Sequence, residues 1–171
     1  MQTENHNSAV ADITLPPWRR EEIISIAVDT FLAIKTGSDI KAHIRIEGIV
    51  LREYSAFDPE NLKKLQEDFP KHHWKAGFFC QETDPQTGKI CRIIVYNDSY
   101  NETIQLHIIL HEYGHAVLRH TEQCILAEQE ALCFAVVMML LLKLDDAFSL
   151  RSMFHNNKIL QSGGAMKHVS A

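Results

Sequence analysis

The residues with the clearest chemical potential lie in one short stretch, His111-Glu112-Tyr113-Gly114-His115. Residues four apart share one face of an α-helix, so the imidazoles of His111 and His115 can bind one metal ion. Glu112 lies beside them and can take the proton of a water molecule that attacks a carbonyl carbon. Zn²⁺ is the metal that H-E-x-x-H motifs typically hold for this hydrolysis.

The alternative interpretation is that these histidines only cover the surface of a helix. The chain has ten histidines, so chance pairs four residues apart are easier than in most proteins. Two features favour the metal site: a glutamate occupies the position of the base, and the preceding segment 104–110 is strongly apolar. A helix packed into the core by that segment would bury polar side chains, which then need partners such as a metal.

The longer pattern H-E-x-x-H-x-x-G-x-x-H does not continue in this chain. Leu118 replaces its glycine, Thr121 replaces its third histidine, and His120 is one residue out of step. A catalytic zinc usually takes three protein ligands, so we expect the third ligand on the following helix.

Helix geometry favours Glu128 as that ligand. If the two helices form an antiparallel hairpin that turns near 121–122, the rise of about 1.5 Å per residue in both places Glu128 opposite His115. Small residues follow on the same stripe and would let the helices approach closely: Ala131 and Ala135. Glu130 lies on another face and is the alternative, with a role as a solvated carboxylate or as a support for a ligand.

The elements expected around the motif predict an α+β fold, in which a small three-stranded sheet with a β-hairpin packs against a metal-binding helical hairpin and an N-terminal helix. The expected elements are a helix from Pro17 to Gly37, a strand over 48–54, a helix over 59–68, strands over 76–81 and 90–97, and helices over about 100–120 and 122–144.

Two local patterns set the hairpin and the start of the motif helix. The segment 84–88 has turn chemistry, with aspartate, proline and glycine between two apolar runs. Ser99 followed by Glu102 resembles a capping box, which predicts a helix beginning near Tyr100.

Length and composition predict one soluble domain over 15–160, with a disordered tail over 1–14 and a flexible tail over 161–171. The chain has 171 residues, of which 46% are hydrophobic and 23% charged. Its net charge of −5 argues against direct binding to nucleic acid. These properties do not predict an oligomeric state.

The chain is expected to be cytoplasmic. Its N-terminus lacks a basic and an apolar signal region, and its four cysteines form no C-x-x-C pair, which is typical of reduced thiols. The longest apolar run, 131–142, is too short to span a bilayer, so it predicts a buried core helix and no membrane association.

Three stretches of the chain resemble the ImmA/IrrE family of metallopeptidases. The segment 93–97 is similar to the family's strand ending in Asn, 111–115 to its H-E-x-G-H helix, and 128–135 to its E-x-E-A-N-x-F-A helix. The chain departs from the family at Leu132, where Asn is usual, and no proline closes the second helix.

The resemblance implies a zinc metallopeptidase with His111, His115 and Glu128 as ligands and Glu112 as the catalytic base. It also implies the substrate, a helix-turn-helix transcriptional repressor of a mobile element, so that the protein would act as an anti-repressor. A protein of another class stays possible: a zinc-containing module that binds and sequesters a repressor without cutting it.

Two features of the expected peptidase stay open at this point. An extended peptide substrate could add to the sheet edge near 76–81 by strand pairing. A donor to the transition state is expected, and the sequence does not choose among Tyr96, Tyr100 and His107.

Overall fold

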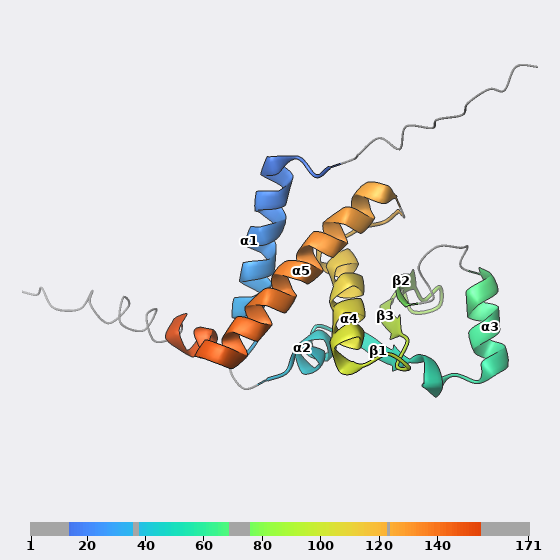
Figure 1. The fold of residues 1–171 in the computed structure, drawn as a ribbon. Helices are drawn as coiled ribbons and strands as arrows, with labels where there is room; N and C mark the ends of the chain where they lie inside the picture. The colour runs from blue at the N-terminus through green and yellow to red at the C-terminus, as the bar shows by residue number, and fades with distance from the viewer. Residues whose placement is uncertain (1–13, 36–37, 69–75, 123, 155–171) are drawn as a thin grey trace, which may run out of the picture.

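The computed structural model describes residues 14–35, 38–68, 76–122 and 124–154 (Figure 1). The tails expected over 1–14 and 161–171 lie outside this range, apart from Thr14, and so does Gly37. The described chain has α1 Pro17–Ala33, α2 Ile40–Ile46, β1 Ile49–Glu53, the 3₁₀ turn η1 Tyr54–Ala56, α3 Pro59–Asp68, β2 Gly77–Thr83, β3 Ile90–Tyr96, α4 Glu102–Val117 and α5 Ile125–Phe148. The expected α+β class is confirmed.

The sheet has three strands in the order β1-β3-β2. β1 runs parallel to β3 and pairs Leu51 with Ile94, whereas β2 runs antiparallel and pairs Phe79 with the same residue. The β2–β3 hairpin closes as expected, because Asp84 Oδ1 accepts hydrogen bonds from the backbone N–H groups of the next turn residues and Gly88 takes a φ of 67°. β2 is therefore an edge strand that runs beside α4.

The motif helix begins two residues later than expected, because another residue caps it. The side chain of Asn101 accepts a hydrogen bond from Ile104 N at 3.1 Å, so α4 starts at Glu102. The Ser99 hydroxyl instead donates to Asn97 Oδ1 at 2.7 Å. Asparagine is at least as good an N-cap as serine, and Asn101 immediately precedes the apolar helical pattern.

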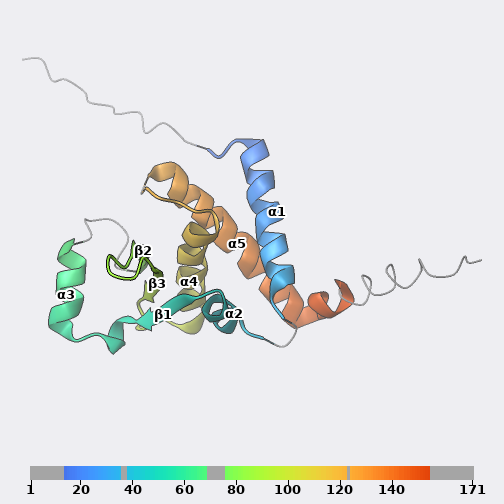
Figure 2. The same ribbon diagram turned by 180° about the vertical axis from the view of Figure 1, so that it is seen from behind.

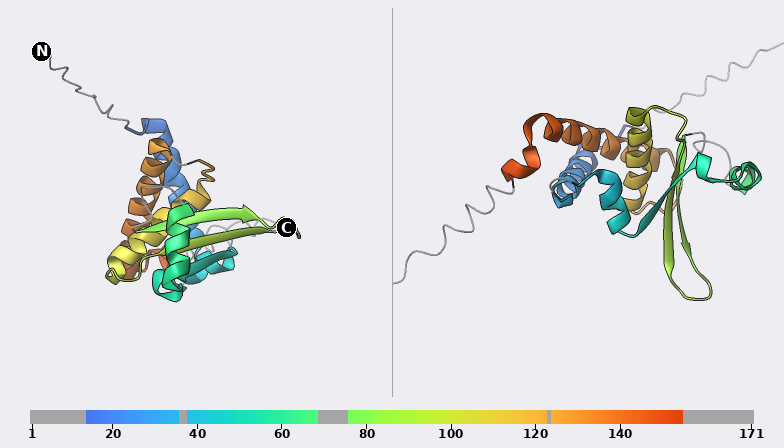
Figure 3. Two further views of the ribbon diagram at one scale, coloured as in Figure 1. Left: turned by 90° about the vertical axis from the view of Figure 1, so that its right-hand side faces the viewer. Right: turned by 90° about the horizontal axis from the view of Figure 1, so that it is seen from below.

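Helices α1, α4 and α5 lie on one side of the sheet. α4 contacts β2, β3 and α5, and α1 packs on α5 (Figure 2). Figure 3 shows α3 on the other side of the sheet from α4, over a smaller apolar cluster of Tyr54, Phe78 and Val95. The motif helix thus lies between the sheet and α5, which is the position that buries its polar residues.

The expectation that 131–142 is a buried core helix is only half right. α5 buries one face with Ala131, Phe134 and Met138, while Leu132 and Leu140 on the opposite face are exposed. Among the described helices, α5 is the one long and apolar enough to cross a membrane by length and composition alone, and 33% of its most apolar window is buried. The apolar run therefore serves both the core and an outer surface.

Candidate metal centre

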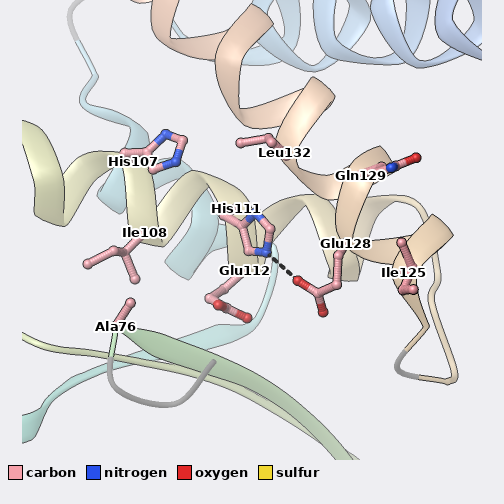
Figure 4. A pocket seen from close by; sticks show the side chains of 9 residues that line it. All are labelled: Ala76, His107, Ile108, His111, Glu112, Ile125, Glu128, Gln129 and Leu132. Atoms are coloured by element: carbon pink, nitrogen blue, oxygen red, sulfur yellow. Dashed lines mark hydrogen bonds and ion pairs between the residues drawn. The ribbon is translucent and has the colours of Figure 1, made fainter. Parts of the chain in front are cut away.

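The structure brings together the two motif histidines and Glu128 (Figure 4). The Nε2 atoms of His111 and His115 lie 3.3 Å apart, and each faces a different oxygen of the Glu128 carboxylate. The distances are 3.1 Å from His111 Nε2 to Oε2 and 3.6 Å from His115 Nε2 to Oε1.

These separations fit a tetrahedral metal ion. With ligand atoms at about 2.0–2.1 Å from zinc, tetrahedral geometry places neighbouring ligand atoms about 3.3 Å apart. The three residues could therefore hold a metal ion without large movements, and within the described ranges no other His/Cys/Asp/Glu group meets the same criterion.

Close contact between α4 and α5 brings Glu128 within reach of the histidines. A Cβ atom at Gly114 would lie 3.2 Å from Cα of Ala131 and 3.1 Å from Cδ1 of Phe134, so the absence of a side chain at Gly114 permits this spacing. Ala131 is fully buried at this contact, as the expected stripe of small residues requires. The glycine of the motif is thus part of the site's architecture.

Glu112 is buried beside the ligands, with 6% of its surface exposed. Burial raises the pKa of its carboxyl group to about 7, although the nearby His111 and His115 and a backbone hydrogen bond from Phe79 act in the opposite direction. Figure 4 shows the carboxylate on the side of α4 that faces Ala76 and the sheet. A carboxylate in this setting can exchange a proton near neutral pH.

A pocket of about 440 Å³ opens onto these groups. Its polar lining includes His111, Glu112 and Glu128, and its apolar walls come from α4, α5 and the residue before β2: Ile108, Ile125, Leu132 and Ala76. Leu132 is the wall that comes from the second turn of α5. The pocket therefore combines a metal-binding set, a buried carboxylate and apolar surface.

Glu130, the alternative ligand, faces away from the two motif histidines and is not solvated. Only 5% of its surface is exposed, and Arg19 on α1 binds both of its oxygens, at 2.8 Å from Nε and 2.5 Å from Nη2. His120 Nε2 lies 3.0 Å from Oε2 of the same carboxylate. The hydrogen bond from Arg19 is the largest cause that holds the pKa of Glu130 below its ordinary value.

His120 lies against His115, one of the residues that could hold a metal ion. Its Nδ1 is 2.9 Å from Nδ1 of His115, the ring nitrogen that points away from Glu128. Residue spacing alone had left His120 outside the motif, and no signal in the sequence pointed to Arg19. His120 was expected to be the last residue of the helix, but α4 ends at Val117, and a turn brings His120 back over the last helical residues.

Of the three candidates for the transition-state donor, only His107 is among the residues that line this pocket. His107 lies one turn before His111 on α4, and burial is the main cause that lowers its pKa. The hydroxyl of Tyr96 is buried and donates to Glu53 Oε1 at 2.7 Å. Tyr100 precedes α4 and is not among the pocket residues.

Comparison with known proteins gives no match to a family model, to a curated protein or to a solved structure. The chemistry assigned to this centre therefore depends on its own geometry.

Proposed function

We propose that the protein is a cytoplasmic zinc endopeptidase, related to the ImmA/IrrE family, that cleaves one specific protein substrate. The observation that carries this proposal is the arrangement of three groups around one pocket. His111 and Glu128 present ligand atoms at metal-binding separations, and the buried carboxylate of Glu112 lies beside them. A site that only stabilised the fold would have no use for a buried base opening onto a pocket.

Zinc and Glu112 would have different roles in hydrolysis. Zinc in a set of two histidines and one glutamate supplies Lewis-acid activation of water and of the scissile carbonyl. Glu112 accepts the proton of the attacking water at its carboxylate and can hand it to the leaving amine. Burial raises the pKa of this carboxyl group from its ordinary value towards neutrality, which favours its action as a base.

The surroundings of the pocket support a peptide substrate. β2 is an edge strand next to the pocket, so an extended peptide can pair with its backbone. The walls at Ile125 and Leu132 suit an apolar side chain. By the family resemblance, we propose that the substrate is a helix-turn-helix repressor of a mobile element.

The test is co-expression of the protein with a repressor encoded beside it, followed by mass analysis of the repressor. We expect one discrete cut, reduced by about 10²–10⁴-fold in Glu112→Gln, which removes the base and no metal ligand. The variant should keep wild-type zinc content, which serves as the control.

Two outcomes would contradict the proposal. Cutting by Glu112→Gln at the wild-type rate would remove Glu112 from the mechanism. Tight binding of the repressor by the wild-type protein without any cut would identify a sequestering module instead.

A further inference from the structure

A turn at the end of α4 brings His120 back onto His115. His120 N donates to His115 O at 3.0 Å and Arg119 N donates to Ala116 O at 3.3 Å, while Arg119 takes a φ of 59°. These two hydrogen bonds and the left-handed residue form a Schellman motif. The motif places the imidazole of His120 over the side of His115 that faces away from Glu128.

The hydrogen bonds from His115 outward are all consistent with one assignment of protons. When His115 binds a metal through Nε2, its Nδ1 carries a hydrogen and donates to Nδ1 of His120. His120 then carries its own hydrogen on Nε2 and donates to Glu130 Oε2. Arg19 on α1 donates two hydrogen bonds to the same carboxylate and is the last residue in this series of hydrogen bonds.

We propose that Arg19, Glu130 and His120 are positioning residues that hold His115 in its metal-binding orientation and tautomer. The partner of a ligating histidine's second nitrogen commonly sets the ring orientation and the basicity of the ligand, and its loss typically costs 10- to 100-fold in metal affinity. Here the partner is a second histidine, which is held by Glu130. Glu130 forms a partly buried ion pair with Arg19 on α1, 111 residues earlier in the chain. The inference rests on the proposed zinc site and not on peptide hydrolysis.

The environment of Glu130 supports a role beyond stability. The Arg19–Glu130 pair is largely buried, and such a pair gives little net stability because desolvation offsets the attraction. Arg19 also pairs with the exposed Glu22 at 2.7 Å, a contact that does not reach the metal centre. The two carboxylates on one arginine therefore offer a matched comparison.

The experiment measures the dissociation constant for Zn²⁺, by competition with a chromogenic chelator, in the full chain. We expect His120→Ala and Glu130→Gln each to weaken binding by about 10- to 100-fold, and Glu22→Gln to bind like wild type. His120→Asn keeps an acceptor near the Nδ1 position and loses the link to Glu130, so its loss should be smaller than that of His120→Ala. The absorption spectrum of the Co²⁺-substituted protein should change in His120→Ala and Glu130→Gln and stay unchanged in Glu22→Gln.

A double-mutant cycle tests whether Glu130 affects Zn²⁺ binding through His120 or only through its own charge. If the residues act through one another, the losses in His120→Ala and Glu130→Gln should not add in the double variant. Additive losses would overturn the proposal. It would also be overturned if both near-isosteric variants, His120→Asn and Glu130→Gln, kept the Zn²⁺ affinity and the Co²⁺ spectrum of the wild-type protein. Failure of the wild-type protein to bind Zn²⁺ would overturn the proposed function together with it.

Discussion

Two glutamates on α5, two positions apart, lie in opposite environments. Glu128 faces the Nε2 atoms of His111 and His115, whereas Glu130 faces Arg19 and His120. Residues two positions apart on a helix lie on different faces, so these two glutamates have different neighbours and different roles. The Glu128 carboxylate is in a position to bind the metal, and the Glu130 carboxylate holds His120, which contacts His115.

This division of roles predicts a clear order of metal affinities. Glu128→Ala should lose more than the 10- to 100-fold expected for a supporting residue, because it removes a ligand atom. Glu130→Ala should stay within that range. Isothermal titration with Zn²⁺ checks the order, and a larger loss in Glu130→Ala than in Glu128→Ala would move the third ligand two residues along.

At the scale of elements, the metal centre depends on how closely α4 and α5 pack. At Gly114 the two helices are in close contact, and the atoms that a methyl group there would meet belong to the backbone of Ala131 and the ring of Phe134. Both residues are fully buried, so a methyl group at Gly114 would have to displace packed atoms of the core.

We therefore expect Gly114→Ala to destabilise the metal-free protein by about 1–3 kcal/mol, the usual cost of overpacking a core. It should also weaken Zn²⁺ binding, because α5 carries Glu128. Chemical denaturation and Zn²⁺ titration give the two values. Unchanged Zn²⁺ affinity together with reduced stability would show that the spacing of the helices does not limit the site.

The other end of α5 is held by a buried ion pair. After Ser149, which takes a φ of 52°, Arg151 donates from its backbone N and from Nε to the carboxylate of Asp145 at 2.7 and 2.6 Å. The guanidinium also lies 5.5 Å from the ring centre of Phe31 on α1. Arg151 thereby ties the end of α5 to α1.

The Asp145–Arg151 pair predicts a pH-dependent contribution to stability. Burial alone would raise the pKa of Asp145, but the hydrogen bonds and charge of Arg151 hold it below its ordinary value of 3.8. The pair therefore stabilises the fold fully at pH values above that ordinary value, and the contribution is lost as the pH falls through the lowered pKa.

Asp145→Asn should lower the free energy of unfolding by about 1–3 kcal/mol at pH 7 and by much less in strong acid. Its neighbour Asp146 is exposed, so Asp146→Asn is the matched control and should change little. Urea unfolding across the pH range measures both variants. An Asp145→Asn deficit that is the same at every pH would rule out the charge of Asp145 as its source.

At the scale of the whole molecule, the pocket belongs to no single element. Its walls come from α4, α5 and the residue before β2, and Leu132 contributes an apolar wall from α5. Val136 lies one turn further along α5 with the same exposure, 45% against 46% for Leu132, but does not line the pocket.

If the pocket receives an apolar side chain of the substrate, Leu132→Lys should lower kcat/KM by about tenfold, which corresponds to the loss of part of a leucine's apolar burial. Val136→Lys should leave it unchanged, and both variants should bind Zn²⁺ like wild type. Peptide cleavage assays compare the two, and equal effects of both substitutions would remove Leu132 from the substrate-binding surface.

The sequence by itself determined what depends on neighbours along the chain. Residues four apart on a helix share a face whatever the rest of the fold does, so His111 and His115 were predictable as a pair. Turn chemistry and alternating apolar runs in the same way predicted the β2–β3 hairpin, which the structure confirms. Helix ends were less certain, because Asn101 and Ser99 compete as caps within three residues.

Spacing along the expected helical hairpin favoured Glu128 over Glu130, and the tertiary structure places Glu128 beside the two histidines. The side of α5 that faces α4 depends on how the two helices pack, which the sequence does not determine. The contacts of Glu130 with His120 and Arg19 join three segments, and Arg19 lies 111 residues before Glu130. No local pattern encodes such a pairing, since arginine and glutamate are ordinary surface residues in most helices. The packing of α1 on α5 brings Arg19 and Glu130 together and shields them from solvent. The turn after α4 brings His120 between Glu130 and His115, which connects this pair to the metal centre.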